Sequence, residues 1–164
     1  EFSNFARMPR PIFKKVNINE VIKKSLDFVK MTSKNSINFK PSKKQIFIKA
    51  DEDQLNRVFI NLIKNSEEAF ISMLKKHPDF KGNINIEIDD NNDYIVFRMT
   101  DNGPGISDAK KVMTPYFTTK KTGTGLGLPI ASKIINEHSG NFLIKNNKNK
   151  IGTTISIRLP KENA

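Results

Sequence analysis

Two asparagines four residues apart carry the first chemical signal. Asn61 and Asn65 lie in the stretch N-R-V-F-I-N-L-I-K-N-S-E-E-A, residues 56–69. Residues four apart share one helix face, and this face differs from the apolar stripe that contains Phe59 and Leu62. Two carboxamide oxygens on one face can bind a hard cation such as Mg²⁺, which keeps waters and phosphate oxygens as its other ligands. In a sequence rich in Asn, two solvated side chains would give the same spacing.

A second block, D-N-G-P-G-I at residues 101–106, directly follows a predicted strand. Gly103 and Gly105 permit backbone conformations that other residues avoid, and they allow close approach to a flat ligand. The carboxylate of Asp101 only accepts hydrogen bonds, which suits the amino group of a purine. Taken alone, Asp-Asn-Gly would predict a β-turn and no more.

A third block, K-K-T-G-T-G-L-G-L-P at residues 120–129, immediately precedes a predicted helix. A glycine loop that leads into a helix N-terminus exposes N–H groups to phosphate oxygens, and the helix dipole favours the bound anion. Lys120 and Lys121 add positive charge, and the alternation of Gly with Leu is not typical of a flexible linker. A fourth block, at residues 151–160, places the hydroxyl of Thr153 at the start of a predicted strand, where it could bind an adenine edge.

These four blocks, in this order and spacing, resemble the GHKL superfamily of ATP-binding domains. That superfamily includes the histidine kinases, gyrase B, MutL and the heat-shock chaperone ATPases. The resemblance extends over about residues 15–160, and N-L-I-K-N, D-N-G-P-G-I, P-Y-F-T-T-K and G-T-G-L-G-L-P-I are most similar to a sensor histidine kinase. The leading F-S-N-F-A-R-M-P-R-P is similar to the end of the dimerisation helix in nitrogen-regulation kinases of the NtrB/NtrY kind.

The resemblance implies a role for each matching residue. Asn65 would hold Mg²⁺ with the help of Asn61, and Lys120 would contact phosphate, so that these three residues would be the catalytic set. Asp101 would recognise the adenine amino group, and Thr153 would lie near the adenine. The remaining residues that the resemblance places at the nucleotide are Glu68, Ala69, Gly103, Gly105, Ile106, Phe117, Thr122, Gly123, Thr124, Gly125, Leu126, Gly127 and Leu128.

Two departures from the superfamily pattern refine the expected activity. Members that hydrolyse ATP have a Glu at the position of Asn61, and since an Asn cannot act as a base, rapid hydrolysis is not expected. A histidine acceptor needs a base less, because neutral imidazole is already nucleophilic near pH 7. The two histidines, His77 and His138, lack the neighbours of a phosphoacceptor box. We therefore expect both to be surface residues at helix ends, and the acceptor to lie on a separate helical-hairpin domain.

Helices and strands must position these blocks, and the hydrophobic pattern predicts them. Helical spacing predicts helices over residues 17–31, 51–76 and 129–139, with Asn17 and Asp51 as N-caps. Alternating runs predict strands over residues 37–40, 46–49, 83–90, 94–100, 141–146 and 153–159. This order predicts an α+β fold, a two-layer α/β sandwich with helices on one face of a mixed sheet, and the resemblance implies the same Bergerat fold. We assign residues 1–14 to the end of a dimerisation helix and a linker, residues 15–164 to the catalytic domain, and residues 107–124 to a lid that nucleotide would order.

Composition narrows the classes of function. The chain of 164 residues contains no Cys, which excludes disulfides and thiolate metal sites. No apolar run approaches the length of a membrane span and no signal peptide is recognisable, so we expect a cytoplasmic domain that meets a membrane only through further segments. The net charge of +11 could indicate a nucleic-acid partner. The Lys residues are scattered without interleaved aromatic residues, so codon bias explains the charge better and we expect no nucleic-acid binding.

The sequence therefore predicts the ATP- and Mg²⁺-binding catalytic domain of a sensor histidine kinase. It would phosphorylate a histidine on the dimerisation domain and serve the receiver domain of a response regulator. One alternative is a GHKL serine kinase of the anti-sigma type, which would carry Glu at position 61. The other is a non-catalytic nucleotide sensor, which would have lost Asn65, Asp101 or the glycines, and all of these are present.

Overall fold

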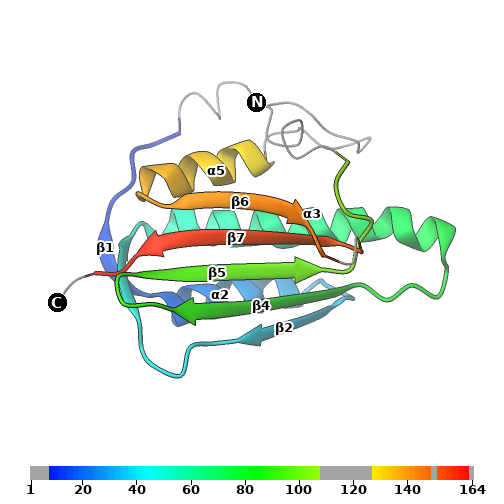
Figure 1. The fold of residues 1–164 in the computed structure, drawn as a ribbon, viewed down its shortest axis with the longest axis horizontal. Coiled ribbons are helices and arrows are strands. Elements are labelled where there is room, and N and C mark those ends of the chain that lie inside the picture. Colours follow the sequence, from blue (N-terminus) through cyan, green and yellow to red (C-terminus); the bar gives the residue numbers. More distant parts are fainter. Residues whose placement is uncertain (1–7, 108–126, 149–150, 163–164) are drawn as a thin grey trace.

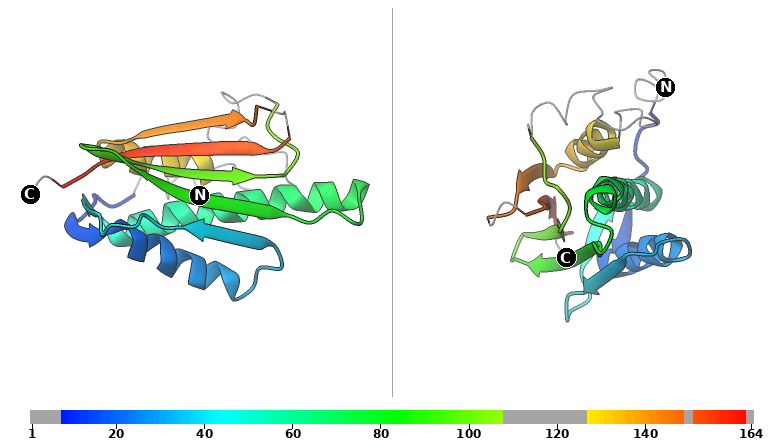
Figure 2. Two further views of the ribbon diagram at one scale, coloured as in Figure 1. Left: turned by 60° about the horizontal axis from the view of Figure 1, so that its bottom comes forward. Right: turned by 90° about the vertical axis from the view of Figure 1, so that its right-hand side faces the viewer.

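The computed structural model describes residues 8–107, 127–148 and 151–162 as a layer of helices packed on one face of a β-sheet (Figures 1 and 2). The strands β2, β4, β5, β7 and β6 form a five-stranded sheet in that order, parallel between β2 and β4 and antiparallel elsewhere. The predicted α+β sandwich with a mixed sheet is thus confirmed. The elements are β1 (Lys14–Asn17), α2 (Ile18–Lys30), β2 (Ser36–Lys40), β3 (Phe47–Ala50), α3 (Glu52–Lys76), β4 (Asn83–Asp90), β5 (Tyr94–Asp101), α5 (Gly127–Glu137), β6 (Asn141–Asn146) and β7 (Thr153–Pro160).

Both predicted N-caps are present and explain where α2 and α3 begin. The side chain of Asn17 accepts hydrogen bonds from the N–H groups of Asn19 and Glu20 at 3.1 and 3.4 Å. The side chain of Asp51 accepts from the N–H of Gln54 at 3.0 Å. Each cap satisfies N–H groups that have no partner within the helix.

Alternate residues of the strands face the helices and build the core. In β5 the inward residues Ile95, Phe97 and Met99 are almost wholly buried, as the period of two in a strand requires. The ring of Phe97 stacks on that of Phe59 from α3, with centroids 4.7 Å apart. Burial of such a side chain stabilises the fold by roughly 1.5–3 kcal/mol. This contact fixes α3 against the middle of the sheet.

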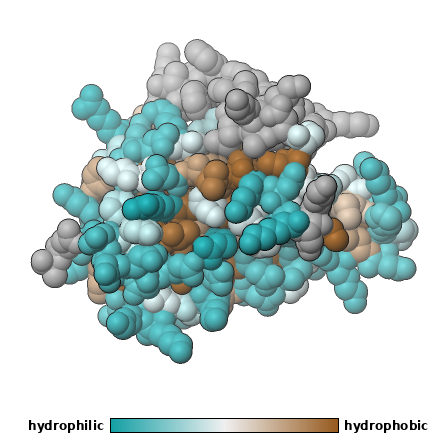
Figure 3. Space-filling view, viewed as in Figure 1, coloured by the Kyte–Doolittle hydropathy of each residue, from teal (hydrophilic) through white to brown (hydrophobic). Residues whose placement is uncertain are grey.

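The opposite face of the sheet is open to solvent and mainly hydrophilic (Figure 3). Arg98 on β5 pairs there with Glu87 and Asp89 of the neighbouring strand, at 2.9 and 2.7 Å. The hydrogen bond to Asp89 is the main cause that raises the pKa of Arg98; desolvation by burial opposes it, and the hydrogen bond to Glu87 raises the pKa further. The described helices therefore cover the other face, and Asp101, Gly103 and Thr153 lie together at one end of the sheet.

The sequence pattern did not predict how the N-terminal strands pair. β1, which begins at the last residue of the predicted linker, was missed, and it forms a separate two-stranded antiparallel sheet with β3. β2 joins the large sheet instead, because its partner β4 lies parallel to it across α3. Met8 precedes β1 outside any helix, whereas residues 1–7, where the end of a dimerisation helix was expected, lie outside the described residues.

Candidate functional site

Asp101, the last residue of β5, is the centre of a buried hydrogen-bond cluster. Its Oδ1 accepts from the backbone N–H groups of Gly103 and Thr153 at 3.0 and 3.2 Å. Its Oδ2 accepts from the hydroxyl of Ser66 on α3 at 2.6 Å. Asp101, Thr153 and Ser66 are exposed by only 8%, 8% and 4%. A carboxylate with these three donors around it is held in one orientation.

The turn before β7 approaches the backbone of Asp101 so closely that only glycine fits. Gly152 has φ of +83°, and a Cβ there would lie 1.9 Å from the carbonyl oxygen of Asp101. Asn147 fastens the same turn, since its side-chain amide donates to the carbonyl oxygens of Asp101 and Ile151 at 3.0 and 2.6 Å. The hydroxyl of Thr154 donates to the Oδ1 of Asn147. These contacts bring Thr153 to the carboxylate of Asp101.

The loop after β5 is held by asparagine side chains that act as backbone partners. Asn146, at the end of β6, accepts from the N–H of Ile106 at 2.7 Å and donates to its carbonyl oxygen at 2.8 Å. Asn102 accepts from the N–H of Asn83 at 2.7 Å. Gly105 has φ of +81°, so the predicted need for a glycine conformation is met there. These hydrogen bonds therefore hold the loop after β5 against the ends of β4 and β6.

Asn65 lies where α3 packs against the N-terminus of α5. A Cβ added at Gly127, the first residue of α5, would lie 3.4 Å from the Nδ2 of Asn65. Asn61 lies one turn earlier on α3, and both asparagines are half-buried, outside the fully buried stripe of Leu62 and Ile63. The amide of Asn65 thus lies beside a helix N-terminus, where N–H groups and the helix dipole attract anions.

The structure therefore brings together two groups of the predicted residues. Asp101, Gly103 and Thr153 form one cluster, and Asn65 lies beside Gly127. Glu68 and Ala69 follow on the next turn of α3, Ile106 lies on the clamped loop, and Leu128 packs against the core from α5. The other predicted residues, Phe117, Lys120, Thr122, Gly123, Thr124, Gly125 and Leu126, lie outside the described residues, as does residue range 108–124 of the predicted lid.

Sequence reasoning missed four residues that hold the site. They are Ser66, Asn146, Asn147 and Gly152. Ser66 had a usable signal, because a serine in the middle of an amphipathic helix, next to Asn65, has no obvious role on the surface. The two asparagines had none, since they look like ordinary turn residues in an Asn-rich sequence.

The predicted surface position of both histidines is correct for His77 and wrong for His138. His77 is exposed at the end of α3, whereas His138 is only 4% exposed. Its Nε2 accepts from the N–H of Asp51 at 3.0 Å, and its Nδ1 lies 2.8 Å from the carbonyl oxygen of Ile134. The edge of the Phe13 ring covers it at 5.1 Å between centroids. The helix end was predicted, but the packing of the chain before β1 over that end was not.

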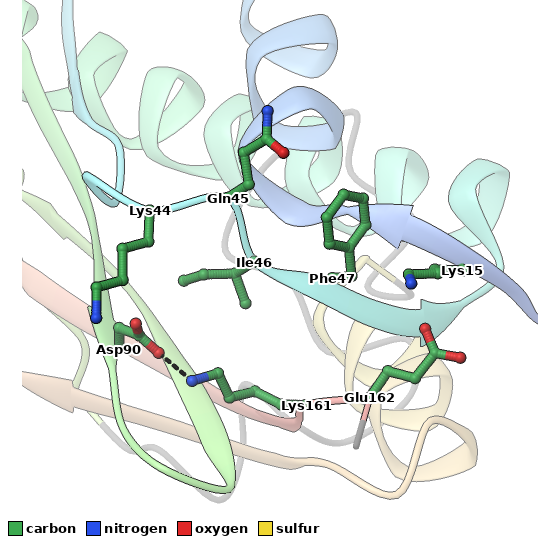
Figure 4. A pocket seen from close by; sticks show the side chains of 8 residues that line it. All are labelled: Lys15, Lys44, Gln45, Ile46, Phe47, Asp90, Lys161 and Glu162. Carbon is green, nitrogen blue, oxygen red and sulfur yellow. Dashed lines mark ion pairs between the residues drawn. The ribbon is translucent and has the colours of Figure 1, made fainter. Parts of the chain in front are cut away.

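A hollow of about 370 Å³ lies at the end of the sheet opposite to Asp101 (Figure 4). Asp90 and Asp101 lie at opposite ends of the β4–β5 pair, so about 20 Å of strand separates the two places. An ion pair of 2.5 Å joins Lys161 to Asp90 on its wall. Its lining residues are Lys15, Lys44, Gln45, Ile46, Phe47, Asp90, Lys161 and Glu162. No predicted nucleotide-binding residue lines this hollow.

Two negative findings concern the described residues only. Within them, no three His, Cys, Asp or Glu side chains gather as a metal site would require. Among the described helices, even the 25-residue α3 is too polar to cross a lipid bilayer.

Comparison with known proteins identifies the family of this chain. Residues 50–163 match the family described as histidine kinase-, DNA gyrase B- and HSP90-like ATPase. A putative NtrY-like sensor histidine kinase of Rickettsia conorii is 33% identical over 161 residues, covering 96% of this chain and 26% of that protein. The chain spans only 21–30% of the length of such curated relatives.

Solved structures of histidine kinase catalytic domains have the same fold. A nucleotide-free catalytic domain of the histidine kinase ThkA superposes with a TM-score of 0.76 at 28% identity, covering 92% of this chain and 98% of that one. ThkA in complex with the response regulator protein TrrA gives a TM-score of 0.74 at 26% identity, over 93% of this chain and 42% of that one.

Proposed function

This chain belongs to the histidine kinase-, DNA gyrase B- and HSP90-like ATPase family, and we propose that it binds ATP with Mg²⁺ and transfers the γ-phosphate to a histidine on a separate domain. The observation that carries the proposal is the carboxylate of Asp101, buried and oriented by three donors at the end of β5. An acceptor fixed in this way suits the amino group of adenine. It is poorly suited to the carbonyl oxygen that guanine has at the same position.

The phosphates would lie toward Asn65 and the N-terminus of α5. Gly127 begins that helix beside Asn65, and N–H groups at a helix N-terminus stabilise phosphate oxygens. Lys120 and the glycines 123 and 125 directly precede α5 in the chain and would add N–H donors and one positive charge.

Asn65, with the help of Asn61, would hold Mg²⁺. Carboxamide oxygens are suitable ligands for this ion when phosphate oxygens and waters complete the shell. Bound Mg²⁺ supplies positive charge that offsets the charge of the transferring phosphoryl group. With an amide at position 61 no carboxylate activates water from that place, which favours transfer over hydrolysis.

Neither histidine of this chain is suited to accept the phosphoryl group. His138 is buried and both of its ring nitrogens are engaged, and His77 lies beyond the C-terminal end of α3. Phosphoryl transfer needs the nucleophile near contact distance and in line with the leaving group. The acceptor would therefore be a histidine of a dimerisation domain. By analogy with ThkA and TrrA, a response regulator would receive the group next.

Calorimetry with ATP and GTP, each with and without Mg²⁺, tests the binding step. We expect ATP to bind about tenfold or more tightly than GTP, because an unpaired buried acceptor costs roughly 1–3 kcal/mol. Asp101→Asn should remove this preference, since the amide can donate to a carbonyl oxygen. Equal affinity of the unchanged chain for both nucleotides would contradict the role of Asp101.

Radiolabelled ATP·Mg²⁺ tests the transfer step. We expect acid-labile label on an added dimerisation domain that carries the acceptor histidine, and none when that histidine is changed to Ala. Asn65→Ala should reduce the transfer sharply while the fold is retained. Label on this chain alone would contradict the proposal, and so would rapid release of free phosphate.

A further inference from the structure

Ser66 occupies an unusual place for a helical serine. Serine hydroxyls within helices commonly donate back to a carbonyl oxygen of the preceding turn, as Ser72 of α3 does to the oxygen of Ala69 at 2.8 Å. Ser66 instead donates across to Oδ2 of Asp101 at 2.6 Å, from a position that is 4% exposed. The hydroxyl has one proton, so this bond uses its whole donor capacity.

The surroundings strengthen this hydrogen bond. Phe70 lies one turn after Ser66 on the same face of α3 and is 1% exposed. Its ring edge lies 3.4 Å from the place where a Cβ of Gly103 would be. The carboxylate and the hydroxyl therefore meet beside an apolar wall, where hydrogen bonds to a charged group are stronger than in water.

The acceptor positions of Asp101 can be counted. A carboxylate has about four. The N–H groups of Gly103 and Thr153 take two on Oδ1. Among the described residues, the hydroxyl of Ser66 takes one on Oδ2, which leaves one position on Oδ2. Because the hydroxyl proton is already used, a ligand meets acceptors at both Ser66 and Oδ2.

We propose that Ser66 is a positioning residue that makes the site selective for 6-aminopurine nucleotides. It turns the Asp101 carboxylate so that one acceptor position on Oδ2 is aimed at one N–H of the ligand's amino group. This inference rests on the proposed nucleotide-binding function and goes beyond it, because it assigns base selectivity to a residue of the metal-binding helix. Asn65 and Ser66 are consecutive, so α3 sets the base-recognising and phosphate-facing groups in register with each other.

The test compares ATP with purine riboside triphosphate, which has hydrogen in place of the amino group. Affinities of the unchanged chain and of Ser66→Ala are measured with Mg²⁺ by calorimetry, and Ser72→Ala is the matched control on the same helix. We expect the unchanged chain and the control to prefer ATP by about tenfold, which is the value of one hydrogen bond to a charged group. Ser66→Ala should lose most of this preference while its affinity for purine riboside triphosphate changes less than about twofold.

A purely structural role of Ser66 gives a different result. Both nucleotides would then lose affinity in parallel, and their ratio would not change, which would overturn the proposal. Ser66→Thr keeps a hydroxyl, so it should retain the preference even if its extra methyl group weakens both affinities. Should Ser66→Ala fail to fold, Ser66→Cys serves instead, since its thiol is a weak donor and the same loss of preference is expected.

The outcomes also separate this inference from the proposed function. An unchanged chain that binds neither nucleotide contradicts nucleotide binding itself. An unchanged chain that prefers ATP, together with a Ser66→Ala chain that prefers it equally, contradicts only the role of Ser66. The dependence of ATP affinity on Mg²⁺ should be the same in Ser66→Ala and the unchanged chain, because Asn65 is retained. A lost Mg²⁺ dependence would show that the substitution disturbs α3, and the proposal would fail.

Discussion

Two polar clusters lie near the two ends of the contact between the antiparallel helices α3 and α5 (Figure 1). One, which we call the capping cluster, contains the half-buried Asp51 with the buried Gln54 and His138. The other, which we call the site cluster, contains the buried Ser66 of α3, Asp101 of β5 and Thr153 of β7. Both are built around an aspartate that accepts from backbone N–H groups. The hydrogen bonds of the two aspartates alone would not tell which cluster binds a ligand.

The difference lies in what closes each cluster. In the capping cluster, Asp51 accepts from Ile12 as well as from Gln54, and the Phe13 ring covers His138. The Oε1 of Gln54 has no hydrogen-bond partner among the described residues, but it is buried away from solvent. In the site cluster, glycine turns take the place of covering side chains, and Asp101 keeps an acceptor position among the described residues. A functional site is therefore distinguished by the absence of covering side chains around a polar group, more than by the polar group itself.

Four substitutions test this comparison, and they follow in order of the expected loss in free energy of unfolding.

Gly152→Ala should have the largest effect. A Cβ would lie 1.9 Å from the carbonyl oxygen of Asp101, and φ of +83° is unfavourable for alanine. Strain and displacement together should cost about 3 kcal/mol or more, measured by chemical denaturation. Gly105→Ala is the control. It has a similar φ, but the nearest atom is the side-chain oxygen of Asn146, which can move. An equal loss in the two variants would show that φ matters and the close approach does not.

His138→Ala should come next and should separate stability from ligand binding. The N–H of Asp51 would lose its partner within a partly buried cluster and a cavity would remain, which together cost about 2–3 kcal/mol. ATP affinity should change less than about twofold, since the site cluster is at the other end of the helix pair. His77→Ala, at an exposed position, should change the free energy of unfolding by less than about 0.5 kcal/mol. A large loss of ATP affinity in His138→Ala would show that the two clusters are coupled.

The sequence predicted the elements well and their cross-contacts poorly. Caps, strand alternation and the glycine blocks are local, so Asn17, Asp51 and the ends of β4 were found from neighbours in the chain. The bonds from Ser66 to Asp101, and from His138 to Asp51, join residues 35 and 87 positions apart. No local pattern encodes such pairs. The position of Asp101 beside Thr153 was predicted only because the family resemblance supplied that long-range contact.

Asp101→Asn should have a smaller effect on stability than His138→Ala and a larger effect on function. The amide oxygen can still accept from the N–H groups of Gly103 and Thr153, and the amide nitrogen can donate to the Ser66 hydroxyl, so the loss should be about 1–2 kcal/mol. The preference for ATP over GTP should disappear. Thermal unfolding followed by circular dichroism, together with calorimetry, measures both quantities. A variant that loses more stability than His138→Ala would place Asp101 with the structural residues.

Lys161→Met should have the smallest effect and supplies a partly exposed reference for both clusters. Lys161 lies on the wall of the hollow shown in Figure 4, where it pairs with Asp90 at 2.5 Å. It also donates to the carbonyl oxygen of Asn91 at 2.7 Å. The two side chains are 22% and 28% exposed, so water and salt screen the pair. Methionine keeps the apolar stem, and the loss should be about 1 kcal/mol or less. The loss should shrink as the salt concentration rises from about 0.05 to about 0.5 M, which shortens the Debye length roughly threefold. A cycle with Asp90→Asn isolates the pair from the bond to Asn91. A contribution of more than about 2 kcal/mol from the Lys161–Asp90 pair, or one that does not change with salt, would contradict this expectation. The two polar clusters would then stabilise the fold no more than this partly exposed ion pair does.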